Sequence, residues 1–344
     1  MKKRAYIALS LILLLCVGYM AGPKAPVPNL HPAPLSSSIP IDSLNGHLAL
    51  LESQFENLKP GNEARIVWAS DSAVKTEYAV VYLHGLSASH QEGAPVHTAF
   101  ATRYGCNLYL TRLYGHGLDK EDALGDLTPE NYLESAKEAI AIGKTIGKKV
   151  IIMCCSTGGT LGLYLTAHDP EIAAIICYSP NIDIYDSNSN ILTKPWGVQL
   201  VRLIMGGQNR SYEAPDEFKK YWQTSYRLEG LVATRSLIDA TMTEETFGKI
   251  TQPVFVGCYY KDEANQDEIV SVQAMREMMG ELGTLESEKV YVEFPDVEAH
   301  VITNPLRSKD VESVMKETFR FAESVLGLSS TGQSASPDLR AIDP

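Results

Sequence analysis

Between residues 64 and 326, short apolar segments alternate with longer segments that have the spacing of amphipathic helices. The apolar segments are 64–68, 78–83, 106–110, 149–154, 173–178, 253–257 and 289–294. The helical segments lie near 94–103, 129–146, 158–168, 271–282 and 308–326. Strands that are apolar throughout must be covered on both faces, and helices between successive strands provide that cover. The pattern therefore predicts an α/β fold, with a mostly parallel sheet and helices on both faces.

The alternation is interrupted once, between residues 184 and 250, where we predict no strand. The helical segments of this region lie near 195–205, 215–225 and 229–240. An insertion of this length in a regular α/β sheet is typical of a cap. We therefore assign residues 184–250 to a helical cap, and residues 45–183 and 251–326 to the core.

The N-terminal segment has the composition of a targeting sequence. Three basic residues, Lys2, Lys3 and Arg4, precede an almost wholly apolar run that ends near residue 22. This pattern indicates a signal peptide or a single membrane anchor over residues 1–22. The basic residues should stay inside, so we expect export, with the domain facing the periplasm or the cell exterior. Cys16 follows three leucines in a loose version of a bacterial lipoprotein signal, which leaves lipidation open.

Two other segments differ in composition from the core. Residues 23–44 are rich in Pro and Ser, which favours a linker. Residues 46–58, directly after the linker, have helical spacing. The C-terminal residues 327–344 are low in complexity and are predicted to be disordered.

Charge and cysteine content exclude some classes of partner. The formal net charge of −12 argues against nucleic acid, because phosphate contacts need clustered Lys and Arg. Beyond the apolar run, the spacing of the cysteines suits neither a zinc site nor a disulfide framework. These cysteines are Cys106, Cys154, Cys155, Cys177 and Cys258. Buried free thiols are favoured, and a disulfide between neighbouring strands remains open.

The strand at 149–154 runs directly into Ser156, and a helix follows. Serine hydrolases built on an α/β sheet place their nucleophile at such a turn, in the pattern G-x-S-x-G. Small residues two before and two after the serine let the strand and the helix approach each other. Gly158 satisfies the second position, whereas Cys154 stands where the first glycine is usual. We predict Ser156 as the nucleophile of a nucleophile elbow.

A cysteine nucleophile is a less favoured interpretation of the same segment. Cys155 would have Met153 two residues before it and Thr157 two residues after it, and neither fits the pattern.

His84 and Gly85 directly follow the strand at 78–83. A sharp turn at this glycine would let the backbone N–H of Leu86 point at a substrate oxygen. Together with the N–H of Thr157, it would form an oxyanion hole with two donors.

The general base should come late in the chain, because the order in this fold is serine, acid, histidine. Of the eight histidines, only His300 lies in the loop after the last predicted strand. His116 belongs to a Gly-His-Gly turn earlier in the chain, and we assign it a structural role.

These motifs make the sequence resemble the α/β-hydrolase-fold serine hydrolases of the monoacylglycerol lipase and carboxylesterase type, which include serine aminopeptidase-like proteins. The resemblance covers residues 64–326 and rests on HG at 84–85, GHG at 115–117, the elbow, the cap and His300. It implies the α/β-hydrolase fold and hydrolysis of a carboxylic ester through an acyl-enzyme. It also implies a small-molecule or lipid ester as substrate, such as a short or medium acyl ester or a monoacylglycerol, with no cofactor and no metal.

The acid that completes the triad is Asp262 or Asp267. Asp262 is nearer the end of the preceding strand, where this fold usually places its acid. In the family that the sequence resembles, the acid is typically followed by an apolar residue at +3 and by Pro or a small polar residue at +4. Val270 and Ser271 match these positions for Asp267, so we favour Asp267.

Two alternatives to an esterase remain open at this point. A proline-type aminopeptidase shares the fold and the cap, and Glu213, Asp216 and Glu217 could then bind a substrate amine. A non-catalytic binding module is the other alternative, although intact Ser156 and His300 argue against it. The sequence does not indicate an oligomeric state.

Overall fold

The computed structural model describes residues 2–332, so residue 1 and most of the predicted C-terminal tail lie outside the described range. All seven predicted strands are present and belong to one sheet. They are β1 (Arg65–Val67), β2 (Thr76–Leu83), β3 (Asn107–Leu110), β4 (Gly147–Cys155), β5 (Ile172–Tyr178), β8 (Val254–Asp262) and β10 (Lys289–Phe294). A two-residue strand, β9 (Asn265–Gln266), pairs with β8 and was not predicted.

The strand order is β1-β3-β2-β4-β5-β8-β10. Neighbours from β3 to β10 pair in parallel, whereas β1 pairs antiparallel with β3. The carboxyl ends of the parallel strands therefore meet at one edge of the sheet, which is where α/β folds place their functional residues.

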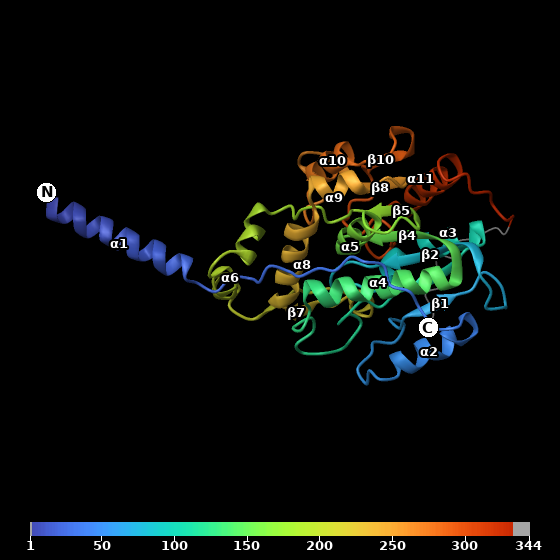
Figure 1. Ribbon diagram of the computed structural model, residues 1–344, viewed down its shortest axis with the longest axis horizontal. Coiled ribbons are helices and arrows are strands. Elements are labelled where there is room, and N and C mark those ends of the chain that lie inside the picture. Colours follow the sequence, from blue (N-terminus) through green and yellow to red (C-terminus); the bar gives the residue numbers. More distant parts are fainter. Residues whose placement is uncertain (1, 333–344) are drawn as a thin grey trace.

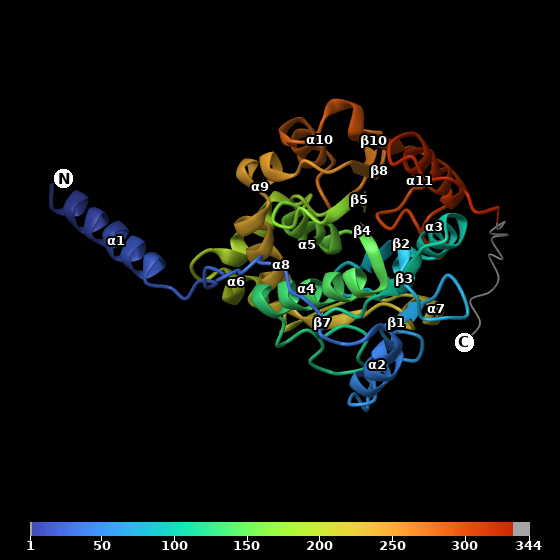
Figure 2. The same ribbon diagram turned by 45° about the vertical axis from the view of Figure 1, so that its right-hand side comes forward.

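Helices cover both faces of the sheet, as Figure 2 shows. One face carries α3 (Val96–Tyr104) and α11 (Val311–Ser324), which pack on side chains such as Val80, Met153 and Phe255. The other face carries α4 (Pro129–Ile146), α5 (Thr157–Thr166) and α10 (Val272–Glu281). Successive residues of a strand point to opposite faces, so Val80 joins the first cluster and Val81 the second. The predicted α/β fold with a mostly parallel sheet is confirmed.

The start of α4 follows from its sequence. The Thr128 hydroxyl accepts the N–H of Asn131 at 3.2 Å, and the Asn131 side chain accepts the N–H of Thr128 at 2.9 Å. Pro129 occupies the first helical position, where its missing N–H costs no hydrogen bond. Such a capping box stabilises a helix start by about 1 kcal/mol.

Residues 184–250 contain mainly helices: α6 (Gly197–Met205), α7 (Asp216–Lys219), α8 (Leu228–Thr241) and α9 (Glu244–Lys249). The expectation of no strand here was wrong, because β6 (Asn209–Ser211) and β7 (Ser225–Arg227) form an antiparallel pair. Both strands are three residues long and mostly polar, so they lack the apolar alternation that identifies a strand. The predicted helix at 215–225 extends only over α7.

α8 packs against the core rather than standing apart from it. Ala233 and Leu237 are buried in the same cluster as residues of α4 and α5. This second half of the region 184–250 therefore stabilises the sheet layer, while α6 lies at the periphery, towards the N-terminal helix (Figure 1).

The N-terminal region consists of α1 (Lys2–Met20), an extended segment and α2 (Leu44–Glu52). Among the described residues, none of the helices combines the length and the apolar character needed to cross a membrane. The extended segment touches α6, because the Trp196 N–H donates to the Pro23 carbonyl at 2.8 Å. α2 ends at Glu52, earlier than the predicted residue 58.

Candidate active site

Ser156 lies in the turn between β4 and α5, with φ 52° and ψ −123°. This positive φ is strained for a residue other than glycine, and such strain is common at functional sites. The turn is held by the Ser156 N–H, which donates to the Tyr178 carbonyl at 3.1 Å, and by its carbonyl, which accepts the Asn181 N–H at 2.9 Å. This strained turn from strand to helix is where the sequence predicts the nucleophile elbow.

Gly158 explains why the residue two after the serine must be small. A Cβ added to Gly158 would lie 2.0 Å from the carbonyl oxygen of Leu83 and 2.8 Å from that of His84. α5 and the end of β2 are thus in backbone contact at this glycine.

Gly158→Ala should therefore destabilise the fold. Because the obstacle is backbone, α5 and β2 must separate, and we expect the free energy of unfolding to fall by about 1–3 kcal/mol. Urea denaturation measures this change. Gly280→Ala is the matched control, because a Cβ at that helical glycine meets nothing within 4 Å. The control should leave the stability unchanged or raise it by up to about 1 kcal/mol. Equal effects of the two variants would contradict the close approach.

The departure from the usual motif at Cys154 has a structural reason. The Cys154 side chain points towards α5, and a Cβ on Gly162 would lie 3.5 Å from its sulfur. Gly162, one helical turn further along, thus provides the space for Cys154. The Cys154 sulfur also lies 3.5 Å from that of Cys177, its register partner on β5.

The structure does not favour a cysteine nucleophile. Cys155 is fully buried, and burial raises the pKa of its thiol well above the ordinary value. The thiolate, which is the reactive form, is therefore disfavoured. Cys106, Cys154, Cys155, Cys177 and Cys258 are all buried free thiols.

The loop after β2 presents the backbone N–H of Leu86. The ring of His84 accepts the Leu113 N–H through Nε2 at 3.1 Å, so its Nδ1 carries the proton and donates to the Gly85 carbonyl at 3.0 Å. Burial lowers the pKa of His84 well below its usual value, which keeps this ring neutral. A trans peptide points its N–H away from its carbonyl, so the Leu86 N–H faces away from His84.

Thr157 supplies the second amide, because it is the first residue of α5 and its N–H has no acceptor within the helix. Within the described residues, neither the Leu86 N–H nor the Thr157 N–H donates to another group. Both predicted oxyanion-hole donors are thus available.

His300 and Asp267 form a hydrogen-bonded pair. Asp267 is 1% exposed, and its Oδ2 lies 2.7 Å from Nδ1 of His300. Its other oxygen, Oδ1, accepts the backbone N–H groups of Ile269 and Val270 at 2.9 and 3.2 Å. These bonds fix the carboxylate and orient the imidazole, so that Nε2 remains to exchange protons.

Asp262 is placed differently. Its Oδ1 accepts the Ala264 N–H at 3.0 Å and the Asn265 side-chain amide at 2.8 Å in an exposed turn. It makes no hydrogen bond to His300. The structure therefore pairs His300 with the favoured carboxylate, Asp267.

Other residues considered from the sequence lie outside this arrangement. His116 is fully buried, stacks on Tyr132 and bonds the Tyr114 carbonyl at 2.8 Å, which is a structural role. The acidic residues considered for amine binding lie on the surface beside lysines. These pairs are Glu213 and Asp216 with Lys219, and Glu217 with Lys220.

Glu92 also lies close to the candidate site residues and was not predicted from the sequence. It is 2% exposed, and its carboxylate accepts the Gly85 N–H at 2.8 Å. Its pKa is raised to about 7, because burial outweighs the hydrogen bond from Gly85 and the neighbouring His300. A single Glu in a loop follows no recognisable pattern, so only the spatial arrangement identifies it.

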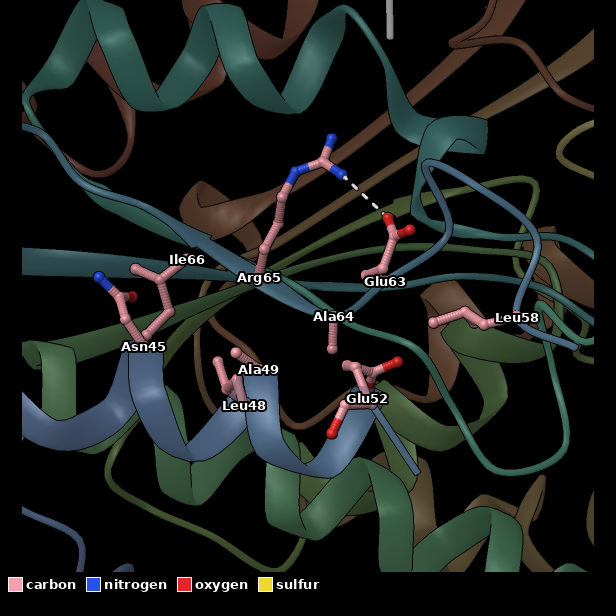
Figure 3. Close-up of a pocket in the computed structure, with 10 residues that line it drawn as sticks. Asn45, Leu48, Ala49, Glu52, Leu58, Glu63, Ala64, Arg65 and Ile66 are labelled. Carbon is pink, nitrogen blue, oxygen red and sulfur yellow. Dashed lines mark ion pairs between the residues drawn. The ribbon is translucent and has the colours of Figure 1, made fainter. Parts of the chain in front are cut away.

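A cavity of about 530 Å³ lies elsewhere, between α2 and β1. Figure 3 shows its apolar lining, which includes Leu48, Ala64 and Ile66, and the ion pair between Arg65 and Glu63 at 4.0 Å. None of the candidate site residues lines it.

The mostly parallel sheet with helices on both faces gives this protein its class: the chain has the α/β-hydrolase fold. Among solved structures, it is similar to a metagenome-derived lipolytic enzyme of the LipS and LipT pair, with a TM-score of 0.58 and 16% identity over 77% of this chain and 98% of that chain. It is also similar to the monoacylglycerol lipase of Paleococcus ferrophilus, with a TM-score of 0.53 and 15% identity over 75% of this chain and 98% of that chain.

At the level of sequence, the chain is 31% identical over 105 residues to the thermostable monoacylglycerol lipase of Bacillus sp. (strain H-257). The matched segment covers 30% of this chain and 41% of that lipase, so it spans about two fifths of the relative. No family model matches the chain.

Proposed function

We propose that the protein is a serine hydrolase that cleaves a carboxylic ester through an acyl-enzyme. The observation that carries this proposal is the hydrogen-bonded Asp267–His300 pair, which occurs in the same fold as the strained turn at Ser156. The sequence similarity to a monoacylglycerol lipase supports an ester over an amide.

In the proposed reaction, His300 takes the proton of the Ser156 hydroxyl through Nε2, and Oγ attacks the ester carbonyl. The N–H groups of Leu86 and Thr157 stabilise the oxyanion, and Asp267 stabilises the imidazolium. His300 then gives the proton to the leaving alcohol. Water, activated by the same imidazole, releases the acid and restores Ser156.

The proposed substrate is a short or medium acyl ester, or one like a monoacylglycerol. Apolar side chains of α6 support an amphiphilic substrate, because they are exposed rather than packed inside the cap. These residues include Leu200, Leu203 and Met205.

A panel of acyl esters of increasing chain length, run beside aminoacyl amides on the full-length protein, tests the proposal. We expect turnover of at least one ester to exceed that of every amide. Faster cleavage of the amides would replace the esterase proposal with the aminopeptidase alternative, and absence of any turnover or covalent labelling would favour the binding module.

We expect kcat/KM to fall at acidic pH, with a midpoint above the ordinary pKa of histidine. Burial and, to a smaller extent, Arg307 lower the pKa of His300, but Asp267 and the charge of Glu92 outweigh them and raise it. The base must be neutral, so reactivity is present above this raised pKa and is lost as the pH falls through it. Measuring kcat/KM against pH checks the prediction, and a midpoint below about 6.5 would contradict it.

We propose that the natural protein is exported by residues 1–22 and faces away from the cytoplasm. Fractionation of its host, with external protease added to intact cells, measures this. Activity confined to the soluble cytoplasmic fraction would contradict it.

Cys16→Ala should change the processing of the protein if Cys16 carries a lipid, and unchanged processing would leave a plain signal or anchor.

A further inference from the structure

Glu92 contacts the loop after β2 that presents the Leu86 N–H, which we call the oxyanion loop. It lies in a short 3₁₀ helix, His90–Gly93. Its Oε2 accepts the Gly85 N–H at 2.8 Å and the Tyr82 hydroxyl at 3.4 Å. The thiol of Cys155, the residue before the nucleophile, also interacts with this carboxylate, and the charge of Glu92 helps to raise the pKa of that buried thiol.

The backbone beside Glu92 is bound to the loop that follows His300. The Thr303 hydroxyl donates to the carbonyl of Glu92 at 2.7 Å. The Asn304 side-chain amide donates to the neighbouring carbonyl of Gln91 at 2.6 Å. The 3₁₀ helix therefore connects the loop that carries the oxyanion donor with the loop that carries the base.

Gly85 brings Glu92 close to the nucleophile. A Cβ on Gly85 would lie 2.9 Å from the Cβ of Ser156 and 3.1 Å from Oε1 of Glu92. Gly85 thus lies between the carboxylate and the elbow, and the Cys155 carbonyl oxygen is also near, at 3.4 Å from the same Cβ position.

We propose that Glu92 is a positioning residue of the hydrolase site, which aligns the oxyanion loop through the Gly85 amide and places a carboxylate in the surroundings of the base. The inference rests on the proposed function and adds a fourth side chain to Ser156, Asp267 and His300.

The alignment follows from the two ends of Gly85. The Gly85 N–H donates to the Glu92 carboxylate, and the Gly85 carbonyl accepts from Nδ1 of His84 at 3.0 Å. With both groups fixed, the peptide that carries the Leu86 N–H has one orientation. Without the carboxylate, the buried Gly85 N–H would lose its partner, which disfavours this conformation of the loop.

The charge acts on the base during acylation, when His300 becomes an imidazolium. Glu92 raises the pKa of His300, in addition to the larger contribution of Asp267. The other titratable groups around Glu92 include Tyr82, Tyr132, Cys154 and Cys155, and burial raises the pKa of each well above its ordinary range. Arg307 also acts on His300 and opposes the two carboxylates by lowering the pKa of the imidazole. Of these groups, Glu92 is therefore the one that can add negative charge beside His300 near neutral pH, in addition to Asp267.

Titration of His300 by NMR tests the charge without requiring a substrate. In full-length protein labelled at histidine, with the signal identified by its loss in His300→Gln, Glu92→Gln should lower the pKa of His300. Glu298→Gln is the control, because Glu298 lies in the same loop but is exposed and pairs with Lys309. The control should leave the pKa of His300 unchanged.

The rate of labelling by a fluorophosphonate at pH 8 tests the alignment. Glu92→Ala removes the acceptor of the Gly85 N–H, so we expect the labelling rate constant to fall on the order of 10²-fold, comparable to the loss of one oxyanion donor. Glu92→Gln should lose less, because its amide oxygen still accepts that N–H. A purely structural role would instead lower thermal stability and leave the pKa of His300 unchanged in the folded glutamine variant.

An unchanged pKa of His300 in Glu92→Gln, or a wild-type labelling rate in folded Glu92→Ala, would overturn the inference. If no ester is turned over while the pKa shift is present, the ester proposal fails and the role of Glu92 stands.

Discussion

Ser156→Ala should abolish covalent labelling by a fluorophosphonate and lower ester turnover on the order of 10⁶-fold, the loss seen when the serine of a comparable triad is removed. The reason is geometric, because Ser156 is the residue held at the strained turn with φ 52°. His300→Ala should have about the same effect, since the serine and the histidine act as one unit. Mass spectrometry of the labelled peptide and steady-state kinetics measure the two results.

Ser324→Ala is the control for this prediction, because Ser324 lies at the exposed end of α11. It should retain both labelling and turnover. Labelling of a different serine in Ser156→Ala would mean that the elbow does not carry the nucleophile.

Asp267→Asn should lower kcat by roughly 10⁴-fold, because asparagine cannot stabilise the imidazolium and favours the wrong tautomer of His300. Asp262→Asn provides the matched control on the same strand end. Asp262 instead bonds Ala264 and Asn265 in an exposed turn, so its replacement should cost little. The measurement is kcat for both variants, with folding checked by circular dichroism.

A large loss in Asp262→Asn together with near-normal activity in Asp267→Asn would reverse the assignment of the acid. The hydrogen bond of 2.7 Å between Asp267 and His300 would then be a structural contact only.

The sheet could be predicted because its strands are recognisable one at a time. β2, β4 and β5 are nearly continuous apolar runs, since helices cover both of their faces. β6 and β7 could not be predicted, because they are short and mostly polar and each is defined as a strand by its pairing with the other. The end of α2 was misplaced for a similar reason: residues 53–58 have helical spacing, but Ser53 already forms the C-terminal cap.

The site divides in the same way. Ser156 and His300 follow from local motifs and chain order. Asp267 was favoured because Ser271 suits a helix start, and Ser271 does accept the Ala274 N–H at 3.1 Å as the cap of α10. Glu92 could not be identified, because its role depends on contacts with Gly85, with Cys155 and with the loop after His300, which are distant in the sequence.

The strand order also has a consequence for when the candidate site is assembled during folding. Gly85, Ser156, Asp267 and His300 follow β2, β4, β8 and β10, so the site joins residues separated by more than two hundred positions. Parallel pairing joins strands that are distant in the sequence, such as β5 with β8, so it requires the closure of long loops and is slow. His300 is synthesised after Gly85, Ser156 and Asp267, because it follows them in the sequence. A chain that has folded only as far as β5 would carry the nucleophile without its base, so the appearance of labelling at Ser156 would report completion of the sheet.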